Sequence, residues 1–153
     1  MAAAHTLLSQ AGWHGADLAT LVRNQLAPYT TDANMTIVGT DIMVGPLATQ
    51  ALAMVLHELV TNAAKYGALS IPGGRVSVSW EQAGTNLIFV WREFDGPRAT
   101  AAIQPGYGTD LIRNIIPHEL GGSVDLAFAS HGARCSIEFP LERSDYADQH
   151  ILS

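Results

Sequence analysis

Several residue types are scarce in this sequence, and each shortage excludes a class of protein. A single cysteine, Cys135, rules out an internal disulfide and fits a reducing compartment. Only eight Lys and Arg residues stand against 14 Asp and Glu, and the net charge of −6 argues against binding to nucleic acid or an anionic membrane. No uncharged apolar run reaches the ~18 residues of a membrane-spanning helix. The first residues also lack the basic and apolar regions of a signal peptide, so a cytoplasmic location is expected.

In other respects the amino-acid composition is that of an ordinary globular domain. The chain has 153 residues, of which 48% are hydrophobic, so it can bury the core of one domain without a disulfide or a metal. Cys135 falls in an alternating strand pattern and is expected to be a small core residue. A catalytic thiol is the less favoured interpretation, because Arg134 is the only basic residue beside it.

Hydrophobic periodicity and turn residues predict the order of the elements. The first half should contain a helix over residues 3–10 ended by Gly12, a helix from the cap Asp17 to Leu26 stopped by Pro28, a hairpin of strands 35–38 and 42–44 around Gly39-Thr40-Asp41, and a long helix over 47–66 stopped by Gly67. The second half should contain a hairpin of strands 76–80 and 87–93, a loop over 94–108, a helix from Asp110 to Gly121-Gly122, and strands 124–128 and 135–141. Pro140 should place the last strand at a sheet edge or a strand end.

Three polar residues share one face of the otherwise apolar long helix. Glu58, Asn62 and Lys65 are spaced i, i+4 and i+7, which puts them within roughly 60° of one line. Carboxylate and amide oxygens suit Mg²⁺ or an activated water, and a lysine suits phosphate. A plain solvated helix face is the alternative interpretation, and this helix alone does not decide between the two. Because asparagine is a poor helix former, its position modestly favours a functional site.

A second polar signal is Glu93, which has the same parity as Leu87, Phe89 and Trp91. The strand therefore directs a carboxylate toward the core, where it needs a partner such as a bound ligand. The alternative, which the spacing leaves equally open, is that the strand has ended or bulged and Glu93 lies in solvent.

A third signal is the pair Gly106 and Gly108, directly before the helix that starts at Asp110. Backbone N–H groups at such a helix start can bind an anion, although a plain turn is the more common explanation. No strand precedes the pair and no third glycine follows, so a Rossmann fold is excluded. A zinc protease helix is excluded as well, because position 61 after His57-Glu58 is Thr61 and not histidine.

These signals occur together in one known family. The run from His57 to Ser70, the triplet Trp91-Arg92-Glu93, the run from Gly106 to Ile112 and the segment His118 to Gly122 resemble, in this order, the ATP-binding catalytic domain of sensor histidine kinases. More narrowly, they resemble the HWE family, named for a histidine in the first motif and Trp-x-Glu in the second. The resemblance covers nearly the whole chain. We therefore expect an α+β fold, a two-layer sandwich with helices on one face of a mixed sheet (the Bergerat ATP-binding fold).

The resemblance implies a role for each matching residue, with ATP and Mg²⁺ as cofactors. Asn62 would bind Mg²⁺, with Glu58 beside it as the second catalytic residue. Glu93 would accept a hydrogen bond from the adenine amino group. The remaining nucleotide-binding positions would be His57, Lys65, Tyr66, Gly96, Gly106, Gly108 and Thr109.

The chain also departs from the family. It has Asp95 where a glycine is usual, which puts ATP affinity in doubt, and Ala133-Arg134 where many members carry threonine. No phosphoacceptor histidine segment is found, and His5 is a poor candidate. We expect residues 1–12 to be the remnant of an upstream dimerisation and phosphoacceptor helix, 13–142 to be the catalytic domain and 143–153 to be a flexible tail.

The expected function is transfer of the ATP γ-phosphate to a histidine on a separate helical domain of the same kinase, and from there to the receiver domain of a response regulator. Two alternatives stay open. One is a degenerate docking module that binds a regulator without nucleotide, for which Asp95 is the best support. The other is an ATP hydrolase of the same superfamily, in which Glu58 would activate water.

Overall fold

The computed structural model describes residues 15–97, 107–129 and 132–141. In chain order its elements are β1 Ala16–Asp17, α2 Leu18–Leu26, η2 Ala27–Tyr29, β2 Met35–Gly39, β3 Met43–Val44, α3 Pro46–Lys65, η3 Ala68–Ser70, β4 Arg75–Ala83, β5 Asn86–Phe94, α4 Tyr107–Ile115, η4 Ile116–Leu120, β6 Ser123–Ala129 and β7 Gly132–Pro140. The expected helix over 3–10 and the tail after 142 lie outside the described residues. Within the described part, no helix is both long and apolar enough to cross a membrane.

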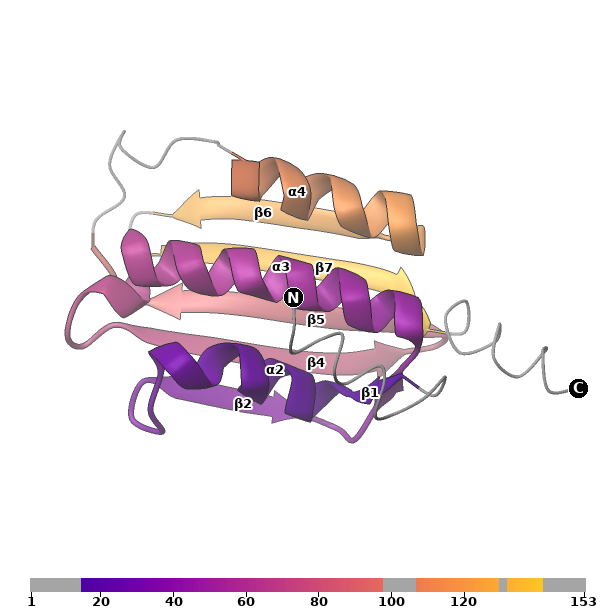
Figure 1. Cartoon of the computed structure of the whole chain (residues 1–153), viewed down its shortest axis with the longest axis horizontal. Helices are drawn as coiled ribbons and strands as arrows, with labels where there is room; N and C mark the ends of the chain where they lie inside the picture. The colour runs from indigo at the N-terminus through magenta and orange to yellow at the C-terminus, as the bar shows by residue number, and fades with distance from the viewer. Residues whose placement is uncertain (1–14, 98–106, 130–131, 142–153) are drawn as a thin grey trace, which may run out of the picture.

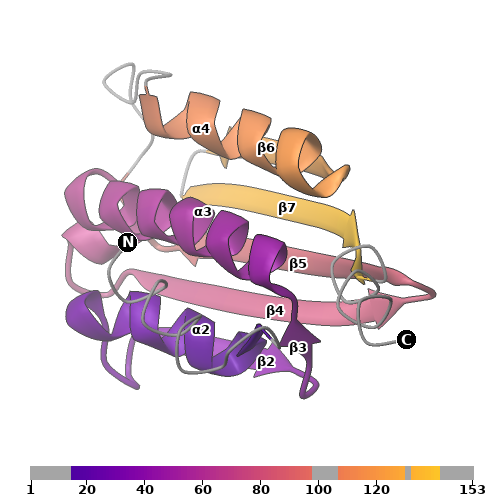
Figure 2. The same cartoon turned by 45° about the vertical axis from the view of Figure 1, so that its right-hand side comes forward.

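The molecule has two layers. The five strands of the main sheet follow the order β2-β4-β5-β7-β6, with β2 parallel to β4 and every other pair antiparallel. Helices α2, α3 and α4 lie side by side on one face of this sheet (Figures 1 and 2). The expected two-layer fold with helices on one face of a mixed sheet is therefore confirmed.

The core lies between the helices and the sheet, and strand parity decides which residues enter it. On the three central strands the buried side chains alternate with exposed or half-buried ones, as expected for a sheet with one covered face. These buried strand residues are Val76, Val78, Trp80, Leu87, Phe89, Trp91, Cys135, Ile137 and Phe139. They pack against α3, which buries ten residues along its length.

The helices agree with the sequence to within a few residues. The Asp17 carboxylate caps α2 by accepting the Thr20 N–H at 3.1 Å. A short 3₁₀ turn that contains Pro28 then ends it. Helix α3 ends one residue earlier than expected, and Gly67 follows it. Helix α4 starts at Tyr107, three residues before Asp110, so Gly108 and Thr109 lie in its first turn.

The predicted hairpin of strands 35–38 and 42–44 is wrong. Strand β2 pairs in parallel with β4, and β3 pairs with β1 in a separate two-stranded sheet. The cause is a contact far along the chain, because the Trp80 indole N–H donates to the Thr40 carbonyl at 2.9 Å. A Cβ on Gly39 would overlap the same indole ring, so the supposed turn is a packing site for Trp80.

Pro140 marks the end of a strand and not a sheet edge. Strand β7 lies between β5 and β6, and the edges of the sheet are β2 and β6. The Leu141 N–H, directly after Pro140, donates to the Thr85 carbonyl in the turn between β4 and β5.

Cys135 is fully buried, as expected of a core residue. Burial, with a smaller contribution from Asp125, raises the pKa of its thiol to about 12. Because the thiolate is the reactive form, we expect a disulfide reagent to label native Cys135 at least ~100-fold more slowly than the urea-unfolded chain at pH 8. Rapid stoichiometric labelling of the native protein would contradict this assignment.

Candidate functional site

Three chain segments that carry the predicted site residues meet at one end of the molecule. The carboxyl end of α3, the carboxyl end of β5 and the amino end of α4 lie together at the left of Figure 1. Residues 98–106, which connect β5 to α4, fall outside the described part of the chain, and Gly106 is among them. Gly108 lies in the first turn of α4, and Gly96 follows β5 as a half-buried residue.

The polar face of α3 is partly sheltered and its side chains are unbonded. Glu58 and Asn62 are half-buried and Lys65 is exposed. Within the described residues, neither the Glu58 carboxylate nor the Asn62 amide has a hydrogen-bond partner, whereas neighbouring Thr61 donates its hydroxyl to the His57 carbonyl at 2.9 Å. Both groups are partly exposed, so they are accessible to a ligand as well as to solvent.

Glu93 is the buried acid of the fold. Its side chain is only 9% exposed and it lies inside β5, directly opposite Val76. One carboxylate oxygen, Oε2, accepts the Trp91 indole N–H at 3.0 Å, and the other, Oε1, accepts the Ala68 backbone N–H at 3.0 Å. The alternative that Glu93 lies in solvent is therefore wrong, and the carboxylate joins the end of β5 to the chain just after α3.

Two glycines make room for this carboxylate. A Cβ on Gly67 would overlap Glu93 Oε1, and a Cβ on Gly132 would overlap the Glu93 backbone carbonyl. Gly67 therefore does more than stop α3, because the acid packs directly against its Cα. We name Trp91, Glu93, Gly67 and Gly132 the carboxylate seat.

The electrostatics of the seat are balanced between two effects. Burial raises the pKa of Glu93, and the hydrogen bonds from Ala68 and Trp91 partly oppose that increase. Each carboxylate oxygen has two acceptor positions, and the protein fills one on each. Glu93 can therefore still accept a hydrogen bond from a ligand amino group.

Asp95 adopts a conformation that explains why glycine is usual there. Its φ is +56°, the left-handed region that glycine enters without penalty. Its carboxylate forms an exposed ion pair with Arg75 at 3.2 Å, and the Arg75 guanidinium also lies 5.3 Å from the centre of the Phe94 ring. The extra negative charge is thus partly neutralised on the surface.

The other predicted residues surround this end of the fold. Tyr66 is 54% exposed at the end of α3, His57 is exposed on the same helix, and Thr109 is buried in the first turn of α4. Across the described residues, no group of three His, Cys, Asp or Glu side chains could hold a metal ion by itself. A metal at Asn62 would therefore need further ligands from elsewhere, such as phosphate oxygens.

Two contributors to the site could not be predicted from the sequence patterns. Ala68 gave no signal, because a backbone N–H is invisible in a sequence. Trp91 was interpreted only as a core residue, although a buried indole N–H usually requires an acceptor and Glu93 two positions later is within reach.

Comparisons with known proteins find similarity to histidine kinases. Residues 1–41 match the model of a family described as HWE histidine kinase. A blue-light-activated histidine kinase of Rhizobium johnstonii is 34% identical over 142 residues, covering 92% of this chain and 41% of the relative. The chain thus spans less than half of that relative.

Two solved structures share the fold. The histidine kinase domain of a blue-light activated histidine kinase from Erythrobacter litoralis superposes with a TM-score of 0.73 at 14% identity, covering 94% of this chain and 72% of that one. Histidine kinase ThkA, in complex with the response regulator protein TrrA, superposes with a TM-score of 0.60 at 19% identity, covering 82% and 41%. The chain is similar to HWE histidine kinases, and its described residues have the fold of a histidine kinase catalytic domain.

Proposed function

We propose that this chain is the ATP-binding catalytic domain of a two-component sensor kinase, which transfers the γ-phosphate of ATP to a histidine on a separate helical domain. The observation that supports it most is the pairing of two features at one end of the fold. On α3, Glu58 and Asn62 present polar groups that have no hydrogen-bond partner among the described residues, and Glu93 keeps free acceptor positions beside the end of that helix.

Each residue has a place in this proposal. Glu93 accepts a hydrogen bond from the adenine amino group, because its carboxylate is fixed by two N–H donors and has further acceptor positions. Lys65, the only lysine of the chain, binds phosphate. Tyr66 flanks the nucleotide, and the remaining contacts come from His57, Gly96, Gly106, Gly108 and Thr109.

Asn62 and Glu58 form the proposed metal side of the pocket. Their amide and carboxylate oxygens are hard ligands of the kind that Mg²⁺ prefers, and the shortage of other ligands among the described residues fits an ion that arrives with ATP. Held by these two residues, Mg²⁺ would supply positive charge to offset that of the phosphates. Catalysis then consists mainly of positioning the γ-phosphate for attack by the incoming imidazole nitrogen.

The proposed partners are the helical domain that carries the acceptor histidine and the receiver domain of a response regulator. The second partner is supported by ThkA, a protein of the same fold that has been solved in complex with a response regulator.

Calorimetry with a non-hydrolysable ATP analogue tests the binding step. The 153-residue chain is expected to bind the analogue with Mg²⁺ and to bind it at least ~10-fold more weakly without Mg²⁺, because the unneutralised phosphates meet Glu58. A GTP analogue serves as the control. Guanine has a carbonyl where adenine has the amino group that would donate a hydrogen bond to Glu93. Absence of binding to the wild type would refute the proposal and favour a docking module.

A second assay separates a kinase from a hydrolase. A helical hairpin domain with an acceptor histidine, taken from a histidine kinase, is supplied in trans with labelled ATP. Acid-labile, base-stable label on the hairpin supports the kinase. Steady release of phosphate without labelled hairpin would instead assign Glu58 as an activator of water.

A further inference from the structure

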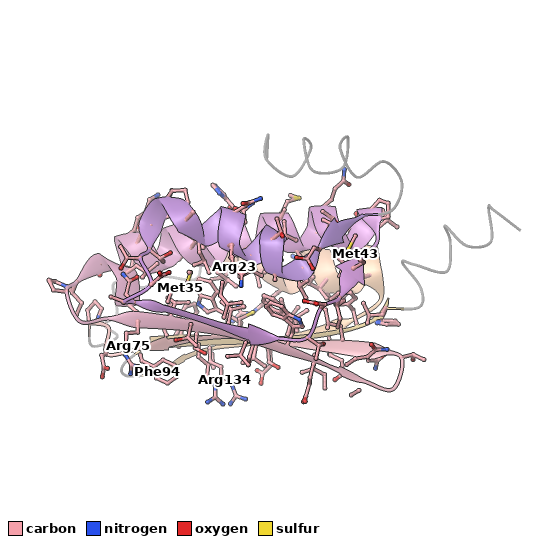
Figure 3. All side chains as sticks on the ribbon, turned by 90° about the horizontal axis from the view of Figure 1, so that it is seen from below. Arg23, Met35, Met43, Arg75, Phe94 and Arg134 are labelled. Atoms are coloured by element: carbon pink, nitrogen blue, oxygen red, sulfur yellow. The ribbon has the colours of Figure 1, made fainter. Side chains whose placement is uncertain are left out.

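The open face of the sheet carries an unexplained arrangement of charges. All three helices lie on the other face, and Figure 3 shows Arg75, Phe94 and Arg134 projecting on the side away from them. In the register of the strands, Arg92 lies directly opposite Arg134, and both side chains are exposed. Like charges placed opposite each other on a sheet are destabilising. Within the described residues neither guanidinium has an ion-pair partner, so folding alone does not account for them.

The opposite end of the same face is acidic. Four residues along the strands from Arg92 and Arg134 lie Ile88 and Glu138, which are register partners, and Glu81 lies on the other side of Ile88. Both carboxylates are exposed, and Glu138 is held in place by the Asn86 amide, which donates to it at 2.8 Å. The face therefore has a basic end and an acidic end.

On the central strands, the row of side chains between the two ends is uncharged, and these side chains are small. It consists of Ser79, Val90 and Ser136, each half-buried and paired across neighbouring strands. Side chains of this size allow two sheets to approach to the usual spacing of about 10 Å.

We propose that this open face binds the open face of a second copy of the chain, with the strands of the two copies running in opposite directions. A two-fold axis along the Ser79–Val90–Ser136 row places residue 134 over residue 138 of the other copy, and residue 92 over residue 88. Arg134 then faces Glu138, and Arg92 lies between Glu81 and Glu138. The surface is self-complementary in charge, which is why a second copy fits it better than a uniformly acidic partner.

The proposed dimer is weak, and the site at the end of α3 stays accessible in it. Five strands of about seven residues offer roughly 500 Å² per copy, below the ~800 Å² of a standard interface. We therefore expect a dissociation constant near ~100 µM that rises with salt, because the charge pairs are exposed to solvent. The helices, with Glu58 and Asn62, lie on the face of the sheet opposite the proposed interface. In the dimer the helices of both copies therefore point outward.

Sedimentation of the full chain from about 10 µM to about 1 mM tests the proposal. Arg92→Glu with Arg134→Glu makes both ends acidic, and Glu81→Arg with Glu138→Arg makes both ends basic. Each variant alone is expected to be monomeric, whereas an equimolar mixture should form heterodimers at least as tight as the wild-type dimer. The matched control is Arg23→Glu with Arg113→Glu on α2 and α4, which changes the net charge equally and should leave association unchanged.

Several outcomes would overturn the proposal. They are a wild type that stays monomeric throughout, swapped variants that still dimerise alone, a mixture that stays monomeric, or a control that behaves as the swaps do. Thermal melts verify folding, and the single pair Arg134→Glu and Glu138→Arg repeats the mixing test if a double variant does not fold. Asp125, in register with Ser136, would meet its own copy at the edge, so Asp125→Asn should tighten the dimer.

Discussion

Replacing Asn62 by alanine is expected to lower phosphoryl transfer by at least ~100-fold while leaving the fold intact or slightly more stable. The loss follows from removing the proposed ligand of the metal that neutralises phosphate charge. The stability gain follows from the structure, because the amide has no hydrogen-bond partner among the described residues and alanine is the better helix former by about 0.5 kcal/mol. Opposite signs for activity and stability distinguish a ligand-binding residue from a structural one.

The measurement combines calorimetric titration of the ATP analogue, the trans-phosphorylation assay and chemical unfolding on the same preparations. Asn24→Ala is the matched control, since Asn24 is an exposed asparagine in the last turn of α2 and should gain some stability without any loss of activity. An Asn62→Ala protein that binds Mg·ATP and transfers phosphate normally would exclude Asn62 from the site.

Replacing Glu93 by glutamine is expected to weaken binding of the ATP analogue by at least ~10-fold and to destabilise the fold. Both carboxylate oxygens accept an N–H, from Trp91 and from Ala68. A glutamine offers only one oxygen, so its own NH₂ must face one of these donors. Leaving a buried N–H without an acceptor costs about 1–3 kcal/mol. The single amide oxygen of glutamine is also uncharged, so it is a weaker acceptor than the carboxylate for the adenine amino group.

The stability difference between wild type and Glu93→Gln should depend on pH in a defined direction. Burial raises the pKa of Glu93 in the folded chain above its value in the unfolded chain, so the folded state binds this proton more tightly. The stability contributed by this proton is fully present below the unfolded-state pKa and is lost as pH rises through the folded-state pKa. Glutamine does not titrate, so the wild-type advantage should shrink as pH rises above about 4, the ordinary pKa of an unfolded-state glutamate.

Urea unfolding of both proteins across that range gives the difference directly. Glu119→Gln, an exposed acid in η4, serves as the control for the loss of one carboxylate charge. A wild-type advantage that grows with pH would mean that the two N–H donors outweigh burial and lower the pKa of Glu93.

Strand parity and helix spacing predicted the parts of the site that depend on local periodicity. The parity of Leu87, Phe89 and Trp91 predicted that Glu93 points into the core, and the i, i+4 spacing predicted one face for Glu58 and Asn62. Neither pattern predicts the backbone donor that binds Glu93, because the Ala68 N–H comes from a turn 25 residues earlier in the chain. Periodicity predicts the direction in which a side chain points. The atoms that it contacts depend on tertiary packing, which periodicity does not contain.

The incorrect hairpin shows the same limit for the fold. Residues 35–44 contain two short apolar runs around Gly39-Thr40-Asp41, and local turn chemistry favours pairing them with each other. The actual partner of β2 is β4, about 40 residues away, and the pairing is accompanied by the bond from Trp80 to Thr40. No residue within ten positions of Gly39-Thr40-Asp41 indicates that Trp80 packs there.

The carboxylate seat also bears on how the sequence can change over time. The tryptophan and glutamate that give the family its name are here one hydrogen-bonded unit, and two glycines distant in the sequence leave the space it occupies. A larger residue at either glycine needs a compensating change at Glu93, because an added side chain there would overlap it. We expect Trp91, Glu93, Gly67 and Gly132 to be inherited as a set, with substitutions among them correlated rather than independent.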